Sequence, residues 1–135
     1  MSTSLTNTRV LIVDDNSETC DLLRTVLEQS GASVVVARSV DRAVHTFRRC
    51  PPHVAIVDIR LGDSDGYAFL EAIRKCNTEY KGFTPVIALT GYASPEDEER
   101  VIAAGFYAYL RKPFIPQEVV SAVASAFWGA VDRAA

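Results

Sequence analysis

Residues 10–15 of this 135-residue chain read Val-Leu-Ile-Val-Asp-Asp, a run of four apolar residues that ends on two adjacent carboxylates. A short run that is apolar at every position is typical of a strand buried on both faces, as in a parallel sheet covered by helices on both sides. Two further runs have the same form, Val54–Val57 before Asp58 and Val86–Leu89 before Thr90. The stretch therefore predicts the first strand of a parallel sheet, with polar residues where the strands end.

Two more strands complete the predicted sheet, one at residues 33–37 and one in the aromatic run 107–110. Between the strands, apolar residues recur three and four positions apart, which predicts a helix after each strand. Five alternating strand–helix units predict an open, doubly wound α/β fold with a five-stranded parallel sheet, five flanking helices and right-handed crossovers.

Turn and capping residues predict where the helices begin and end. A serine N-cap followed by proline and acidic residues predicts a fourth helix over residues 94–105, which stops at a glycine. Gly31 is expected to end the first helix in the same way. The last helix is expected to span about residues 116–129, and the polar stretch 75–84 is expected to be the longest loop.

Composition predicts one domain. The chain is 48% hydrophobic and 23% charged, and a chain of this length can bury a core without disulfides or a structural metal. We expect a flexible N-terminus over residues 1–8, the domain over 9–130 and a C-terminal tail over 131–135. The formal charge of −3 and the lack of a basic run argue against direct binding to nucleic acid.

Cysteine usage and the N-terminus predict a cytoplasmic location without a membrane segment. The three cysteines have neither Cys-x-x-Cys spacing nor a nearby histidine pair, so disulfide and metal-site interpretations are both weak. Free thiols of this kind fit a reducing compartment. Residues 1–9 are polar, unlike a secretory signal, and no apolar run approaches the roughly 20 residues of a membrane span.

Five polar residues are expected to form one site. They follow or end four of the predicted strands, and in open α/β sheets the ligand site lies beyond the carboxyl ends of the strands. These residues are Asp14, Asp15, Asp58, Thr90 and Lys112. Singly, each has an ordinary structural explanation as a helix cap, a turn residue or a solvated lysine. Their joint placement favours a shared site.

The chemistry of this set points to phosphoryl transfer. Three clustered carboxylates repel one another, so they should bind protons or a hard divalent cation, by default Mg2+. A lysine and a hydroxyl beside such a cation suit phosphate oxygens. A carboxylate such as Asp58 can then serve as the nucleophile and form an aspartyl phosphate.

Four motifs carry a resemblance to a known family. They are Val13-Asp14-Asp15, Val57-Asp58 with Gly66 eight residues on, Ala-Leu-Thr-Gly at 88–91, and Gly-Phe-Tyr-Ala-Tyr-Leu-Arg-Lys-Pro-Phe at 105–114. Together they make the sequence similar to the receiver domain of two-component response regulators, from about residue 9 to about residue 129. This resemblance implies a flavodoxin-like sheet in strand order 2-1-3-4-5.

The resemblance also implies roles for the site residues. Asp58 would accept a phosphoryl group from a phosphohistidine donor, which is a sensor histidine kinase or a histidine phosphotransfer protein. Asp14, Asp15 and Asp58 would bind Mg2+ together with the backbone carbonyl of Arg60. Thr90 and Lys112 would contact the phosphoryl oxygens.

Signalling by such a domain would depend on a change of surface. The resemblance implies that Tyr109 is the switch residue, that the peptide before Pro113 is cis, and that the fourth helix, fifth strand and fifth helix contact a downstream protein effector. A homodimer through this face, including Trp128, is a further hypothesis. No enzymatic activity is expected beyond the domain's own phosphorylation and dephosphorylation.

Three alternative functions fit the sequence less well. An Mg2+-dependent aspartyl-phosphate hydrolase uses similar groups but needs its nucleophile in an Asp-x-Asp context after the first strand, and a flavodoxin-type carrier needs a phosphate loop there. A degenerate receiver acting only as a scaffold would lack some of the five site residues. Three positions depart from or tune the family pattern. Gly62 replaces a common proline, and the bulk of Arg60 and Tyr92, together with the charge of Arg60, is expected to slow dephosphorylation.

Overall fold

The computed structural model describes residues 4–61, 64–80, 83–91 and 94–134. Its strands and helices alternate along the chain, with one pair of very short strands added after β3. In order they are β1 (Arg9–Val13), α1 (Ser17–Gln29), β2 (Ser33–Ala37), α2 (Val40–Arg49), β3 (Val54–Asp58), β4 (Arg60–Leu61), β5 (Ser64–Asp65), α3 (Gly66–Tyr80), β6 (Val86–Thr90), α4 (Pro95–Ala104), β7 (Ala108–Arg111) and α5 (Pro116–Ala134).

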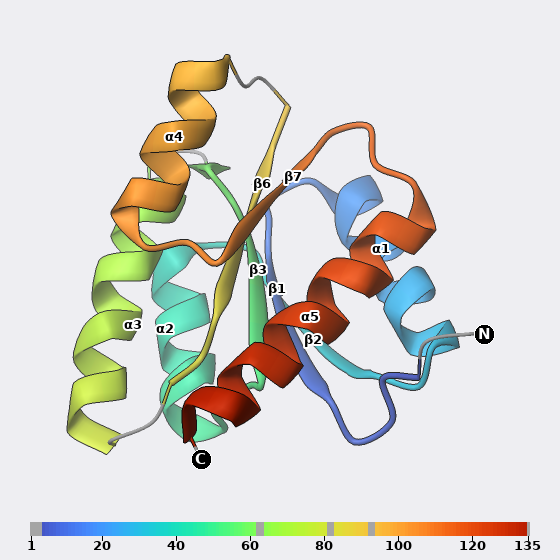
Figure 1. The fold of residues 1–135 in the computed structure, drawn as a ribbon, viewed down its shortest axis with the longest axis horizontal. Coiled ribbons are helices and arrows are strands. Elements are labelled where there is room, and N and C mark those ends of the chain that lie inside the picture. The colour runs from blue at the N-terminus through green and yellow to red at the C-terminus, as the bar shows by residue number, and fades with distance from the viewer. Residues whose placement is uncertain (1–3, 62–63, 81–82, 92–93, 135) are drawn as a thin grey trace.

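Five of the strands form one parallel sheet in the order β2-β1-β3-β6-β7. Counted among themselves, these strands have the order 2-1-3-4-5, so the predicted flavodoxin-like fold is confirmed. Figure 1 shows α1 and α5 on one face of the sheet and α2, α3 and α4 on the other. The remaining strands, β4 and β5, form a separate antiparallel pair that the sequence did not predict.

The sheet separates two hydrophobic cores, which explains why its strands are apolar at every position. In β1, Val10 and Ile12 pack into the core under α1 and α5. Leu11 and Val13 point to the opposite face and join the core under α2, α3 and α4. Because successive side chains of a strand point to opposite faces, a strand covered on both sides needs apolar residues throughout.

The helix ends follow the predicted capping residues. Gly31 and Gly105 follow α1 and α4 with φ angles of 101° and 114°, a left-handed backbone that glycine adopts without steric cost. At the start of α4, Ser94 and Asp97 form a capping box, in which each side chain accepts a hydrogen bond from the other's backbone N–H. The predicted boundaries of the fourth helix are therefore confirmed.

Two predicted boundaries were wrong. The stretch 75–84 is not one long loop, because α3 continues to Tyr80. The helix continues because Cys76 is fully buried and extends the core-facing stripe of Phe69 and Ile73 by one more turn. The last helix also passes the glycine expected to end it and reaches Ala134, as a glycine within a helix costs only about 1 kcal/mol.

The N-terminal segment contacts the body of the domain before β1 begins. Leu5 is 2% exposed and belongs to the core under α1 and α5. Its backbone N–H donates to the carbonyl of Ser30 at 2.7 Å. Part of the segment predicted to be flexible is therefore packed against the end of α1, while the domain limits at residues 9 and 130 stay a prediction. Within the described ranges, no helix combines the length and apolar character that crossing a bilayer requires.

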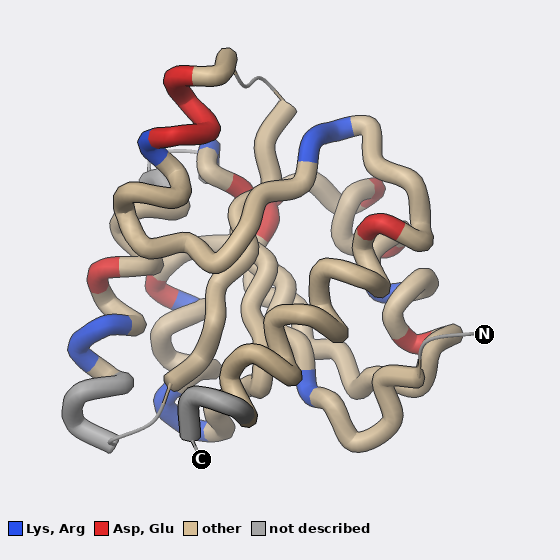
Figure 2. The backbone as a smooth tube through the Cα atoms, in the orientation of Figure 1, with Lys and Arg blue, Asp and Glu red and all other residues tan. Residues whose placement is uncertain are grey.

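Charged residues are arranged along the helix dipoles. Glu96, Asp97 and Glu98 occupy the first turn of α4, and Arg48 and Arg49 occupy the last turn of α2. Figure 2 shows this acidic turn at the start of α4, near the carboxyl edge of the sheet. Acids at a helix start and bases at a helix end interact favourably with the partial charges there.

Candidate functional site

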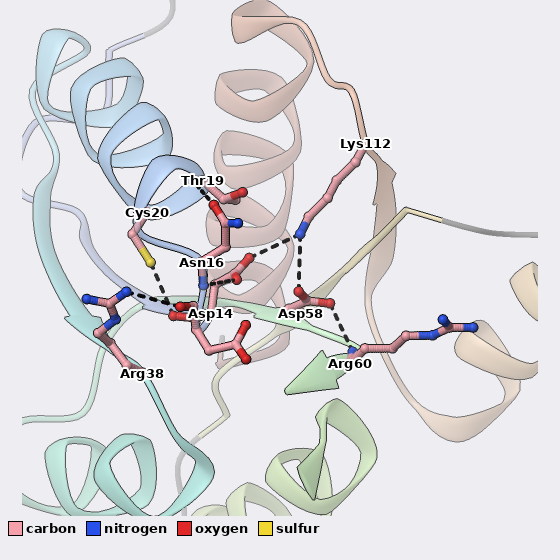
Figure 3. A network of polar contacts seen from close by, with 9 residues as sticks. Asp14, Asn16, Thr19, Cys20, Arg38, Asp58, Arg60 and Lys112 are labelled. Carbon is pink, nitrogen blue, oxygen red and sulfur yellow. Dashed lines mark hydrogen bonds and ion pairs between the residues drawn. The ribbon is translucent and has the colours of Figure 1, made fainter. Parts of the chain in front are cut away.

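The strand register brings the first two acids together. Val13 pairs with Val57 across β1 and β3, and the next residues along the two strands are Asp14 and Asp58. Asp15 follows on the turn that leads into α1. One carboxylate oxygen from each of these three aspartates lies within 4.8 Å of the other two. The predicted acidic cluster therefore exists at the carboxyl edge of the sheet (Figure 3).

Asp14 is the most enclosed of the three acids, with no exposed surface. Its Oδ1 accepts the backbone N–H of Asn16 at 2.9 Å, and its Oδ2 contacts Lys112 Nζ at 3.4 Å. Burial raises the pKa of Asp14 above its ordinary value, and the negative charge of Asp58 adds to this rise, against the opposing effects of Asn16 and Lys112. The ionised form of Asp14 therefore gains from any nearby cation.

Asp58 lies between a backbone donor and an ammonium group. Its Oδ1 accepts the N–H of Arg60 at 2.9 Å, and its Oδ2 contacts Lys112 Nζ at 3.1 Å. Burial lowers the pKa of Lys112, but the hydrogen bond to Asp58 and the charges of Asp14 and Asp58 outweigh this and raise it. Lys112 therefore stays protonated and bridges the two buried carboxylates.

Thr90 and Lys112 reach the site from neighbouring strands. Asp58 pairs with Leu89 across β3 and β6, and Thr90 is the next residue of β6. The N–H of Lys112 donates to the Thr90 carbonyl at 2.8 Å, directly after β7. The Lys112–Pro113 peptide is cis, as the resemblance implied. The structure thus brings all five predicted residues to one edge of the sheet.

The donor set suits a hard divalent cation. Three carboxylates meet here, and within the described part of the chain Lys112 is the one ammonium group that contacts them, through Asp14 and Asp58, so the cluster keeps negative charge that Lys112 does not neutralise. Mg2+ binds hard oxygen ligands such as carboxylates, and Asp15 is the exposed member of the three. The residues present therefore fit the expected metal, whereas ligation by the Arg60 carbonyl stays a prediction.

Most of the chain matches the model of one protein family. A family model described as the response regulator receiver domain matches residues 10–124, a range that includes the three aspartates, Thr90 and Lys112. The chain belongs to the response regulator receiver domain family. Its members are regulatory domains of two-component signal transduction.

The receiver domain has relatives of several lengths. It is 38% identical over 115 residues to an uncharacterized 14.6 kDa protein in the sodA1 3' region of Leptolyngbya boryana, covering 84% of this chain and 86% of that protein. It is 32% identical to the acid tolerance regulatory protein ActR of Sinorhizobium medicae, covering 84% and 57%. It is 31% identical to the sensor histidine kinase GacS of Pseudomonas protegens, covering 85% and 13%. The chain thus spans less than two thirds of ActR and of GacS.

Solved structures of receiver domains have the same fold. A CheY-like response regulator receiver domain protein from Methanospirillum hungatei JF-1 superposes with a TM-score of 0.80 at 28% identity, covering 93% of this chain and 98% of that one. The receiver domain of the Francisella response regulator 1452 gives a TM-score of 0.82 at 28% identity, covering 91% and 98%.

A second polar cluster joins α4 to β7 and was missed in the sequence. Glu98 Oε2 accepts the Tyr109 hydroxyl at 2.8 Å, and Oε1 accepts Arg111 Nε at 2.8 Å as well as a second guanidinium nitrogen of Arg111. The hydrogen bond from Arg111, followed by that from Tyr109, lowers the pKa of Glu98. Acids in a first helical turn are common, so nothing in the sequence singled out Glu98.

Arg38 also contacts the acidic turn, although it was not among the predicted site residues. Arg38 follows β2 directly, and its guanidinium Nη2 donates to the Asp15 carbonyl at 3.0 Å. The strand-end rule that selected Asp14 and Asp58 would have found Arg38 had it been applied to this strand too.

The positions expected to tune the phosphoryl lifetime are only partly described. Gly62 and Tyr92 lie outside the described residues. Arg60 has an exposed side chain, and Figure 3 shows its guanidinium pointing away from Lys112. Slow dephosphorylation through these residues stays a prediction.

Proposed function

We propose that this receiver domain accepts a phosphoryl group on Asp58 from a phosphohistidine of a sensor histidine kinase or a histidine phosphotransfer protein. The observation that carries the proposal is the meeting of three carboxylates within 4.8 Å beside Lys112, whose Nζ contacts Asp58 at 3.1 Å. A nucleophilic carboxylate, a metal-binding acid pair and a fixed cation are what phosphoryl transfer to an aspartate requires.

Asp14, Asp15 and Asp58 would hold Mg2+. When bound, the cation neutralises charge on the phosphoryl oxygens and helps align the group for in-line transfer. Asp14 is buried at the end of the sheet and Asp15 is exposed to solvent. This supports a site in which one ligand is fixed by the fold and another can reach an incoming cation.

In the transfer step, a carboxylate oxygen of Asp58 attacks the phosphorus. A bond forms between this oxygen and phosphorus, the bond between phosphorus and the donor imidazole nitrogen breaks, and its electron pair leaves with the imidazole. Lys112, already paired with Asp58, would stabilise the charge on the transferred oxygens, and the Thr90 hydroxyl would donate a hydrogen bond to one of them.

Phosphorylation would then change the surface formed by α4, β7 and α5. The new group adds about 1.5 to 2 negative charges and three acceptor oxygens. Movement of Thr90 toward these oxygens would open space for the Tyr109 ring, whose hydroxyl donates to Glu98 at 2.8 Å in the present structure. A two-state surface biased in this way would bind a downstream protein effector.

The partner surface includes the outer face of α5. Trp128 is 62% exposed and packs edge-on against Phe127 with ring centroids 5.5 Å apart. A homodimer through this face belongs to the proposal, as does a cytoplasmic location, which the three free cysteines support. The net charge of −3 gives no support for direct binding to nucleic acid.

Transfer of labelled phosphate from a phosphohistidine protein tests this function. The wild-type chain should become labelled in the presence of Mg2+, and hydroxylamine should release the label because the product is an acyl phosphate. Asp58→Asn should stay unlabelled. Asp21→Asn, which changes the same charge on the exposed surface of α1, should be labelled like the wild type. Label that persists in Asp58→Asn, or that resists hydroxylamine, would overturn the proposal.

A further inference from the structure

The turn between β1 and α1 holds its two aspartates in different ways. Asn16 caps α1 by accepting the N–H of Thr19 at 2.9 Å, and its own N–H donates to Asp14 Oδ1 at 2.9 Å. Cys20 Sγ donates to the Asp14 carbonyl at 3.3 Å. These contacts fix Asp14, but none of them involves Asp15. The exposed Asp15 therefore depends on other contacts for its orientation.

Arg38 supplies those contacts from the end of β2. Its Nη2 donates to the Asp15 carbonyl at 3.0 Å and also to the Ser17 hydroxyl. One nitrogen thereby joins the residues on either side of Asn16, and Figure 3 shows Arg38 reaching toward this turn. The planar guanidinium presents its donors in a rigid fork, so it fixes the direction of the Asp15 carbonyl better than a flexible ammonium would.

We propose that Arg38 is a positioning residue that orients Asp15 for Mg2+ binding, an inference that rests on the proposed function. Asp14 and Asp58 are buried, Asp14 directly after β1 and Asp58 at the end of the paired strand β3, so the sheet itself places them. Asp15 is exposed and lies on the turn, so its carboxylate is directed by the backbone that Arg38 restrains. Groups that hold metal ligands in place raise affinity because less ordering is needed on binding.

The direction in which Mg2+ affinity changes when Arg38 is replaced separates a positioning role from a purely electrostatic one. A guanidinium near an acidic site repels a divalent cation, so removing its charge alone would tighten Mg2+ binding. Loss of the restraint on Asp15 would instead weaken binding. A neutral substitution at position 38 therefore moves the dissociation constant in opposite directions under the two explanations.

Isothermal titration of the full chain with Mg2+ measures this directly. Arg38→Ala should weaken Mg2+ binding by about tenfold, at the lower end of effects seen for residues that support metal ligands. Arg38→Gln keeps one donor and should lie between wild type and Arg38→Ala, and Arg38→Lys should also weaken binding although it keeps the charge. Should Arg38→Ala fail to fold, the other two variants carry the test.

Arg24 offers a matched control. It also joins α1 to β2, donating to the Val34 carbonyl at 3.2 Å, and it has no contact with the acidic turn among those the structure describes. Arg24→Ala should bind Mg2+ like the wild type. Unchanged or tighter binding by the Arg38 variants would overturn the inference alone, whereas a wild-type chain that binds no Mg2+ would overturn the proposed function with it.

Discussion

The Tyr109 hydroxyl donates a 2.8 Å hydrogen bond to Glu98, and the other oxygen of that carboxylate is held by Arg111. Tyr109 and Arg111 belong to β7, and Glu98 belongs to α4, so one carboxylate joins the strand to the helix. If Tyr109 moves when Asp58 is phosphorylated, this hydrogen bond must break. Under the proposed switch, Glu98 would set part of the free energy difference between the two states of the surface.

Replacing Glu98 should shift the unphosphorylated domain toward its phosphorylated state. Glu98→Ala removes the acceptor that holds Tyr109 and should move the backbone NMR signals of α4 and β7 partway toward their phosphorylated positions. Glu99→Ala removes the same charge from the next position of α4 and should leave the signals of β7 in place. Identical β7 spectra for Glu98→Ala and wild type would show that the contact does not restrain Tyr109.

Loss of the Thr90 hydroxyl should separate phosphorylation from its consequence. Thr90→Ala keeps Asp58 and the acidic pair, so it should still gain a phosphoryl group, seen by intact mass. Without the hydroxyl, the NMR signals around Tyr109 should no longer change on phosphorylation. A full spectral response in Thr90→Ala would mean that another residue carries the coupling.

Lys112 should stabilise the fold most when no divalent cation is present. Lys112→Met leaves Asp14 and Asp58 facing each other without their ammonium partner, which should lower the free energy of unfolding in EDTA by about 1–3 kcal/mol. Saturating Mg2+ should restore part of this loss, because the cation replaces the missing charge. In urea unfolding, Lys75→Met on the exposed surface of α3 is the control and should behave like the wild type.

His53 should make stability depend on pH below neutrality. Its Nδ1 accepts the N–H of Arg9 at 2.8 Å, and burial, followed by the charge of Arg9, lowers its pKa. The unfolded chain therefore binds this proton more readily, so stability is present above the unfolded pKa of about 6.5 and is lost as pH falls through the folded value. Urea unfolding between about pH 7.5 and 5.5 should show a smaller loss for His53→Gln than for wild type.

A matched histidine checks that this pH dependence is local. His45 is exposed on α2, so His45→Gln should keep the wild-type loss of stability on acidification. Parallel profiles for wild type and His53→Gln would show that the Arg9 contact does not couple protonation to folding.

Much of the fold could be predicted because a strand that is buried on both faces of the sheet has apolar residues at every position. Runs such as residues 10–13 and 54–57 are apolar throughout only because two helical layers cover the sheet. The end of α3 was harder, since the polar residues around Cys76 obscure the buried position that this residue adds to the core-facing stripe. The two-residue strands β4 and β5 are too short to produce any periodicity.

The site residues that lie at the carboxyl ends of the strands could be predicted from the sequence. Asp14, Asp58 and Lys112 follow from the rule that ligands bind beyond the carboxyl ends of parallel strands. Contacts between elements distant in sequence, such as Glu98 with Tyr109 and Arg38 with Asp15, depend on how helices and turns pack on the sheet. Hydrophobic patterns do not encode such side-chain geometry, so these two contacts emerged only from the structure.

The central claim, that Asp58 is the phosphoacceptor, is tested most directly by intact mass after incubation of the full chain with a small acyl phosphate and Mg2+. The account predicts that wild type gains the mass of one phosphoryl group, and that neither Asp58→Asn nor wild type in EDTA does so. An equal gain of mass in Asp58→Asn would contradict the account.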